Sequence, residues 1–129
     1  MASLFTKIIN REIPAHIVAE NDNCLAFLDI MPLTKGHVLI IPKKEIDYIF
    51  DVDDRLLAEL MSFSKQVAAK IKVAFPCKKV GISVVGLEVP HAHIHLIPLN
   101  NISDMDFSKP KLQLSNEELA LIARKIKEA

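Results

Sequence analysis

Three of the five histidines stand two residues apart in the segment His91-Ala92-His93-Ile94-His95. Strict alternation of this kind predicts a β-strand, in which successive side chains point to opposite faces. His91, His93 and His95 would then share one face, roughly 6.6 Å apart at about 3.3 Å per residue. Ala92 and Ile94 would face a core. Imidazoles contribute little as packing, so three in register on one face indicate a site.

Two chemistries suit imidazoles aligned in this way. A His-x-His pair on one strand can supply two zinc ligands, with a third residue completing the set. Alternatively, a neutral imidazole with an ordinary pKa of about 6.5 can attack phosphorus while a neighbouring imidazole stabilises the negative oxygens. The remaining interpretation is that the histidines fall in register by chance. Three histidines on one face argue against it.

The rest of the chain predicts the elements that could position this strand. They are a helix over 3–12, strands over 15–20, 24–30, 37–42 and 79–85, a long helix over 51–75, a polar loop over 100–114 and a last helix over 116–128. Pro14 follows the first helix, Asp51 or Asp53 can cap the long helix, and Ser115 with Glu118 forms a capping box. The apolar run 38–41 predicts a strand buried on both faces. The expected apolar stripe of the long helix is Leu56, Leu57, Leu60, Met61, Ser64, Val67, Ala68 and Ile71.

Composition limits the class of protein. The chain has 129 residues, half of them hydrophobic, which predicts one folded domain over residues 1–129. Lys plus Arg and Asp plus Glu both number 16, so the balance argues against nucleic acid or an anionic membrane as partner. Two isolated cysteines exclude a disulfide framework. No apolar run is long enough to span a bilayer and no signal-peptide pattern opens the chain, so a cytoplasmic location is expected.

The histidine segment, read as His91 to Ile97, matches the signature His-φ-His-φ-His-φ-φ, where φ is hydrophobic. Upstream blocks match as well: Leu4–Ile9 with Glu12-Ile13-Pro14, Cys24–Ile30 with Pro32, and Gly36–Lys43. Over residues 4–99 the chain therefore resembles the histidine triad (HIT) family, and most closely its Hint-like branch of bacterial type. That resemblance implies an α+β fold of the HIT type. This is a five-stranded, mainly antiparallel sheet with one long helix and a C-terminal helix.

The resemblance also implies the reaction, because Hint-like proteins hydrolyse nucleoside 5′-phosphoramidates and related nucleotide conjugates. It implies that His93 is the nucleophile of a nucleotidyl-histidine intermediate, which water then cleaves. His95 would donate to a phosphate oxygen, and His91 would orient the nucleophile and help protonate the leaving group. His37 resembles the family's fourth histidine beside the triad.

The nucleotide pocket follows from the same resemblance. Asp29 resembles the carboxylate that takes the ribose hydroxyls, a use that suits a double acceptor. The family's apolar base pocket would be formed by Phe5, Ile8, Ile13, Phe27 and Ile30. A purine nucleotide or conjugate is thus the expected ligand, in a homodimer that needs no cofactor and no metal. Purely structural roles stay open for these residues. His37 and the five apolar residues could belong to the core, and Asp29 could be a turn residue at the end of a strand.

The sequence departs from the family before the triad. The family usually places an Asn and a glycine-rich loop ahead of Gly-Gln-x-Val, whereas here residues 82–85 run directly into Gly86, and Leu87 stands where Gln is usual. Ser83 is the candidate substitute for holding the phosphate. Thr6 stands where some bacterial relatives carry a zinc-binding Cys, which removes that zinc site.

Three alternative functions remain open at this level. Dinucleoside polyphosphate hydrolysis would be favoured if the shortened turn leaves room for a second nucleoside. A nucleotide-binding regulatory protein with little turnover would fit Leu87 and the missing Asn. A zinc protein would use its ligands from the triad and His37.

Overall fold

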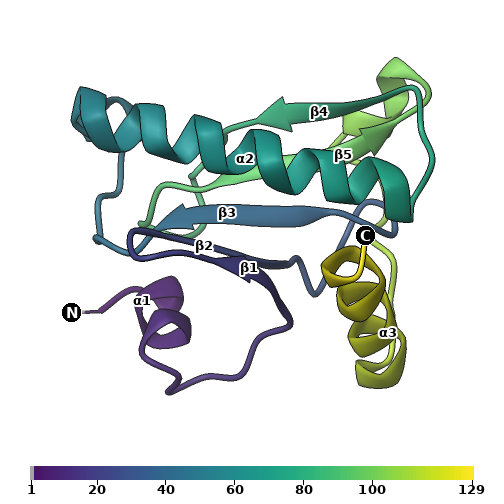
Figure 1. Cartoon of the computed structure of the whole chain (residues 1–129), viewed down its shortest axis with the longest axis horizontal. Coiled ribbons are helices and arrows are strands. Elements are labelled where there is room, and N and C mark those ends of the chain that lie inside the picture. Colours follow the sequence, from purple (N-terminus) through teal and green to yellow (C-terminus); the bar gives the residue numbers. More distant parts are fainter. Residues whose placement is uncertain (1) are drawn as a thin grey trace.

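The computed structural model describes residues 2–129 as an α+β fold built on one five-stranded sheet (Figure 1). The strand order is β1-β2-β3-β5-β4, and every neighbouring pair is antiparallel. The strands are β1 (Ile17–Glu20), β2 (Cys24–Leu28), β3 (Val38–Pro42), β4 (Lys79–Ser83) and β5 (Ile94–Leu99). The helices are α1 (Leu4–Ile9), α2 (Asp54–Ala74) and α3 (Asn116–Lys127), with 3-10 turns η1 (Ile49–Asp51) and η2 (Ile102–Met105). The predicted sheet, long helix and C-terminal helix are confirmed.

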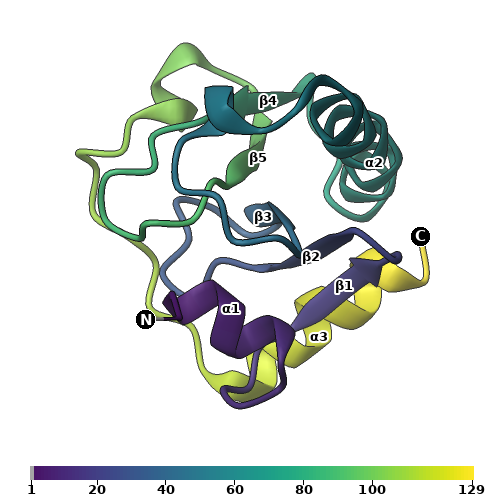
Figure 2. The same cartoon turned by 90° about the vertical axis from the view of Figure 1, so that its left-hand side faces the viewer.

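Helices cover both faces of the central strands β2 and β3. Ala26 and Ile40 face the main core, into which α2 and α3 pack. Phe27 and Leu39 point the other way, into a smaller cluster with α1. Figure 2 shows α1 and α2 on opposite sides of these two strands. Every residue of β3 is buried, as the apolar run predicted, because neither face meets solvent.

The long helix α2 packs its apolar stripe on the sheet. Leu60, Val67 and Ile71 are buried as predicted. Met61 is 47% exposed, so its assignment to the core is wrong, and Phe63 is buried in its place. Met61 falls at the margin because α2 lies near the open edge of the sheet, where Met61 and Ile82 of β4 line one shallow groove.

Helix ends follow their capping residues. Asp53 caps α2 through its side chain, and Ser115 with Glu118 forms the predicted capping box of α3. The first helix ends at Ile9 and does not extend to residue 12 as predicted. Arg11 there adopts a φ of 61°, a left-handed conformation that a right-handed helix does not contain.

The polar segment 100–114 is less simple than the predicted loop. It contains η2 and then returns to the loop before β3, where the Leu112 amide donates to the Pro32 carbonyl at 2.8 Å. Phe107 of this segment thereby lies 4.8 Å, ring to ring, from His95. In the described part of the chain, no helix is both long and apolar enough to cross a membrane.

Candidate functional site

The triad histidines lie where β5 begins. The strand starts at Ile94, so His95 belongs to it, whereas His91 and His93 precede it in a segment without regular secondary structure. The prediction of one strand through all three is wrong at its start, because pairing with β3 reaches only to the pair Ile40 and Ile94. The alternation itself persists, since the residues between the histidines are buried in the main core.

His91 is fully buried and both of its ring nitrogens are engaged. Its Nε2 lies 2.9 Å from the Pro42 carbonyl, which can only accept, so Nε2 carries the proton. Its Nδ1 therefore accepts a hydrogen bond from the Ser3 hydroxyl, also at 2.9 Å. Burial lowers the pKa of His91, which keeps the ring neutral. The ring thus has no free nitrogen for a substrate.

His93 is fixed in the tautomer that a nucleophile needs. Its Nδ1 lies 2.7 Å from the His91 carbonyl, so Nδ1 carries the proton and donates it. The neutral ring therefore has its lone pair on Nε2. The Phe5 ring packs edge-on against His93 at a centroid distance of 5.0 Å and restrains its orientation.

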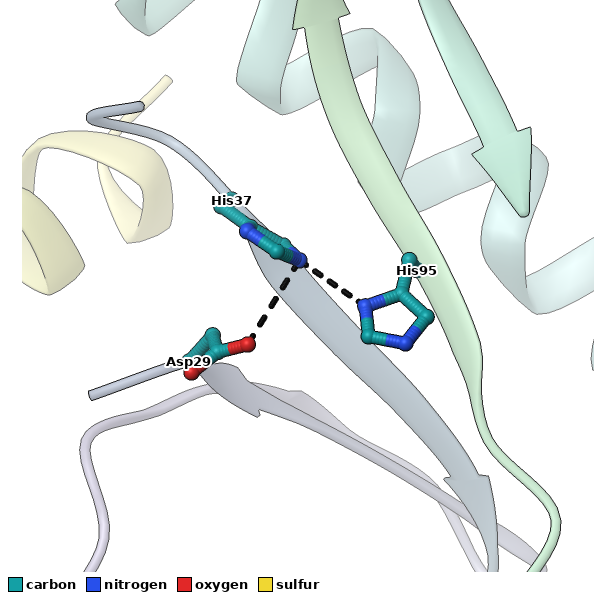
Figure 3. A group of neighbouring side chains, drawn as sticks. All are labelled: Asp29, His37 and His95. Atoms are coloured by element: carbon teal, nitrogen blue, oxygen red, sulfur yellow. Dashed lines mark hydrogen bonds and ion pairs between the residues drawn. The ribbon is translucent and has the colours of Figure 1, made fainter. Parts of the chain in front are cut away.

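His37 and His95 form a directed relay (Figure 3). The Leu33 amide donates to Nδ1 of His37 at 3.1 Å, so the neutral ring of His37 carries its proton on Nε2. That Nε2 donates to Nδ1 of His95 at 2.9 Å, which leaves the proton of His95 on its Nε2. Burial lowers the pKa of His37 to about 3 and that of His95 to about 4. His95 can therefore donate through Nε2 as a neutral ring.

The Asp29 carboxylate stands beside this relay. One oxygen, Oδ1, accepts from the Met31 amide at 2.9 Å, and Oδ2 lies 3.6 Å from Nε2 of His37. Because His37 is neutral at pH 7, this contact is not an ion pair. Burial raises the pKa of Asp29 despite the Met31 hydrogen bond. Since Oδ2 makes no hydrogen bond within residues 2–129, it is available to a ligand hydroxyl.

Asp29, His37 and His95 are the one group in residues 2–129 whose ligand atoms, within 4.8 Å of one another, could hold a metal ion. The tautomer of His37 opposes binding there. Nδ1 of His37 accepts the Leu33 amide, so its Nε2, the atom facing the group, carries the ring proton. A metal-ligating nitrogen must be unprotonated. The hydrogen bonds thus favour the expected metal-free histidine site over the zinc interpretation.

Two cavities meet at the triad. The first, of about 260 Å³, is mostly apolar and is bounded by α1, β2 and the chain between them. All five predicted base-pocket residues line it: Phe5, Ile8, Ile13, Phe27 and Ile30. Ile30 is 63% exposed and forms its rim. The sequence did not assign further apolar residues that line this cavity, among them Leu39 and Val89.

The second cavity, of about 300 Å³, lies on the other side of His93 and His95. Asp29, Glu88 and these two histidines line both cavities, so His93 and His95 stand at their junction, whereas the buried His91 lines neither. The turn 85–88 forms one wall of the second cavity. Phe107 and Lys111, from the segment predicted as a plain loop, form another. No spacing or composition signal in residues 100–114 marked these two residues.

Ser83 does not join this group. It pairs in register with His95 across β4 and β5, but it lines neither cavity. Leu87, which stands where the family usually has Gln, is 89% exposed and touches the second cavity. The geometry therefore does not support the prediction that Ser83 replaces the family's Asn and Gln in holding the phosphate.

An antiparallel sheet that brings oriented histidines to the junction of two cavities defines a class of protein whose site acts through its imidazole rings. The family model described as HIT domain matches residues 10–102, and the chain belongs to this family of nucleotide-binding and nucleotide-hydrolysing proteins. The adenosine 5′-monophosphoramidase HNT1 of Saccharomyces cerevisiae is 38% identical, over 75% of this chain and 62% of that protein.

Two crystal structures carry the same fold. A Hit-like protein involved in cell-cycle regulation from Bartonella henselae has a TM-score of 0.85 and 31% identity, over 98% of this chain and 94% of that one. A zinc-bound histidine triad family protein from Mycobacterium smegmatis has a TM-score of 0.83 and 25% identity, over 99% of this chain and 94% of that one.

Proposed function

We propose that this protein hydrolyses nucleoside 5′-phosphoramidates or related nucleotide conjugates, with His93 as the nucleophile. The observation that carries the proposal is the state of the His93 ring. Its Nδ1 proton is held by the His91 carbonyl, and its side chain lines both cavities. A ring with its proton fixed on one nitrogen presents the lone pair on the other. The similarity to the yeast adenosine 5′-monophosphoramidase supports this chemistry.

The cavities suggest how the substrate binds. A purine base fits the apolar cavity between Phe5 and Phe27, whose rings lie edge to face 5.4 Å apart. The ribose hydroxyls would bond to the open oxygen of Asp29, which lines both cavities. The α-phosphate would then lie at the junction, between His93 and His95. The group that leaves would occupy the second cavity.

The reaction takes two steps in this arrangement. Nε2 of His93 forms a bond to phosphorus as the P–N bond breaks, and the leaving nitrogen takes a proton from water. A water molecule then attacks phosphorus, the P–Nε2 bond breaks, and the proton of that water passes to solvent. In both steps His95 donates from Nε2 to a non-bridging oxygen, the kind of contact whose loss slows enzymes by about 10²–10³. His91, with both nitrogens engaged, orients His93 through its carbonyl and has no proton for the leaving group.

A turnover assay tests the proposal. Adenosine and guanosine phosphoramidates are compared with a diadenosine polyphosphate, for the wild-type protein and His93→Ala. We expect the variant to lose turnover and to bind nucleotide within about tenfold of wild type, or about 1.4 kcal/mol. A variant that keeps more than a few per cent of the activity would remove His93 as nucleophile. A wild-type protein that binds nucleotide and turns over none of the substrates would be a regulatory protein instead.

Dinucleoside polyphosphate hydrolysis is the second candidate. The second cavity, about 300 Å³ next to His93, supports it because a second nucleotide could extend there. A higher kcat/KM for the diadenosine substrate than for both phosphoramidates would establish this alternative.

The homodimer that the resemblance implies is also a proposal, and the edge of the sheet supports it. β4 is an outer strand, so one row of its backbone groups is open to pairing; Ile82 in the strand and Val84 and Val85 directly after it are exposed. An identical edge could pair with it about a two-fold axis. Light scattering should give twice the mass of the chain for wild type and the single mass for Ile82→Lys. A monomeric wild type would contradict the proposal.

A further inference from the structure

The second cavity contains one permanently charged cation. Among the described residues that line it, Lys111 is the only lysine or arginine. The turn 85–88 opposite contributes two hydrophobic side chains, a glycine and Glu88, none of which is a hydrogen-bond donor. Apart from the histidines, Lys111 is therefore the side-chain donor that a group in this cavity can meet.

The Lys111 ammonium is held in place and is only partly satisfied. It donates to the carbonyls of Phe107 and Lys109, and it lies 5.9 Å from the centre of the Phe107 ring. An ammonium has three N–H donors, so one remains for a ligand. In the described part of the chain, no carboxylate forms a salt bridge with Lys111. Asp29 and Asp106 lie close enough for the Lys111 charge to have a lowering effect on the pKa of each carboxyl, but neither contacts the ammonium directly.

The Phe107 ring connects this cation to the triad. The Phe107 ring lies near the Lys111 ammonium and also 4.8 Å, ring to ring, from His95. The segment 100–114, which carries both residues, is held to the loop before β3 by the hydrogen bond from the Leu112 amide to the Pro32 carbonyl. A group bonded to a phosphate at His93 and extending into the second cavity would thus approach Lys111.

We infer that Lys111 recognises a negatively charged oxygen, of a carboxylate or a phosphate, on the part of the substrate that leaves. This inference rests on the proposed function and narrows its substrate class. The preferred substrates are nucleoside 5′-phosphates joined to a leaving group that itself carries an anion. Asp29 and Glu88 also line the second cavity, so a second anion, beyond the α-phosphate held by the histidines, is favoured only beside Lys111.

Three adenosine 5′-phosphoramidates test this inference: those of glycine, glycinamide and 2-aminoethyl phosphate. The first and third carry an anion on the leaving amine, and the second is neutral. Each is assayed with wild type, with Lys111→Met, which keeps the side-chain length without the charge, and with Lys109→Met. Lys109 is exposed on the same segment and lines neither cavity, so its variant is the matched control. Comparing kcat/KM ratios between proteins cancels the intrinsic difference between the leaving groups.

We expect Lys111→Met to lower the anionic-to-neutral ratio of kcat/KM about tenfold and Lys109→Met to leave it within twofold. If Lys111→Met loses kcat/KM only with the glycine conjugate, Lys111 binds a carboxylate. If the loss is confined to the phosphate conjugate, Lys111 binds a phosphate. An equal loss with all three substrates, or an unchanged ratio, would overturn the inference.

The proposed function can fail separately. If wild type hydrolyses none of the three conjugates, the same ratio is taken from their dissociation constants. A tenfold selective weakening in Lys111→Met would then retain the anion site in a binding protein. Equal dissociation constants for wild type and Lys111→Met would show that Lys111 does not bind the anion.

Discussion

Acid should destabilise this protein through His37 and His95, because Nδ1 of each buried ring accepts a hydrogen bond and must be unprotonated, from the Leu33 amide in His37 and from His37 in His95. The folded-state pKa is about 3 for His37 and about 4 for His95, against an ordinary value of 6.5. Both values are lowered, so the unfolded chain binds more protons below pH 6.5. The stability that depends on neutral rings is therefore full above pH 6.5 and is lost as the pH falls toward 4.

The size of the effect follows from these values. At pH 5 an unfolded histidine is protonated while both folded rings stay neutral, which favours unfolding by about 2 kcal/mol for each ring. The pair together accounts for about 4 kcal/mol between pH 7 and pH 5. Small domains are stable by only about 5–15 kcal/mol, so a loss of this size is readily measured.

Urea denaturation at pH 7 and pH 5 measures this loss, and His37→Gln isolates one ring. The glutamine amide can still donate to His95 but does not titrate. We expect wild type to lose about 2 kcal/mol more than the variant on going from pH 7 to pH 5. Asp29, Lys111 and His93, the other charged or titratable groups around the pair, are common to both proteins and largely cancel in the difference. Equal losses in the two proteins would refute the neutral relay.

Two further predictions concern groups that contact the triad or the sugar. Asp29→Ala should weaken ribonucleotides by about 1–3 kcal/mol, the range for a buried polar partner left unpaired, and deoxyribonucleotides by much less. Titration calorimetry with a ribonucleotide and its deoxyribonucleotide decides this, since equal losses of affinity would mean that Asp29 has only a structural role. Ser3→Ala should cost about 2 kcal/mol or more in urea denaturation, because it removes both the donor to Nδ1 of His91 and the cap of α1. A cost below about 0.5 kcal/mol would be too small for either contact.

Much of the fold was predictable because it depends on local pattern. Ser115 and Glu118 marked the start of α3, and the apolar run 38–41 marked a strand buried on both faces. Met61 was misplaced because residues 60 and 61 both fit a helical spacing of three and four. Only the position of α2 near the sheet edge makes one of them buried and the other exposed.

The candidate site was predictable in part. The histidines, Asp29 and the apolar five could be named because each falls in a short block of sequence that resembles the family. The structure brings Asp29, His93 and His95 to the junction of the two cavities and the apolar five to the first cavity. Lys111 and Phe107 could not be named, because a lysine and a phenylalanine in a polar segment have no spacing that marks them. Their place depends on where the chain returns after η2, which is a property of the whole fold.

The sequence alone determined which side chains are available: three alternating histidines, a fourth histidine after a glycine, and an aspartate at a strand end. Tertiary structure alone decided which ring nitrogens carry protons. The Pro42 carbonyl, the Ser3 hydroxyl and the Leu33 amide make that choice, and only folding brings them to the rings. Neutral imidazole has two tautomers of similar energy, so the chain before folding prefers neither strongly, whereas a fixed donor or acceptor selects one. For that reason His93 and His95, alike in sequence, come to present opposite groups: a lone pair on one and a proton on the other.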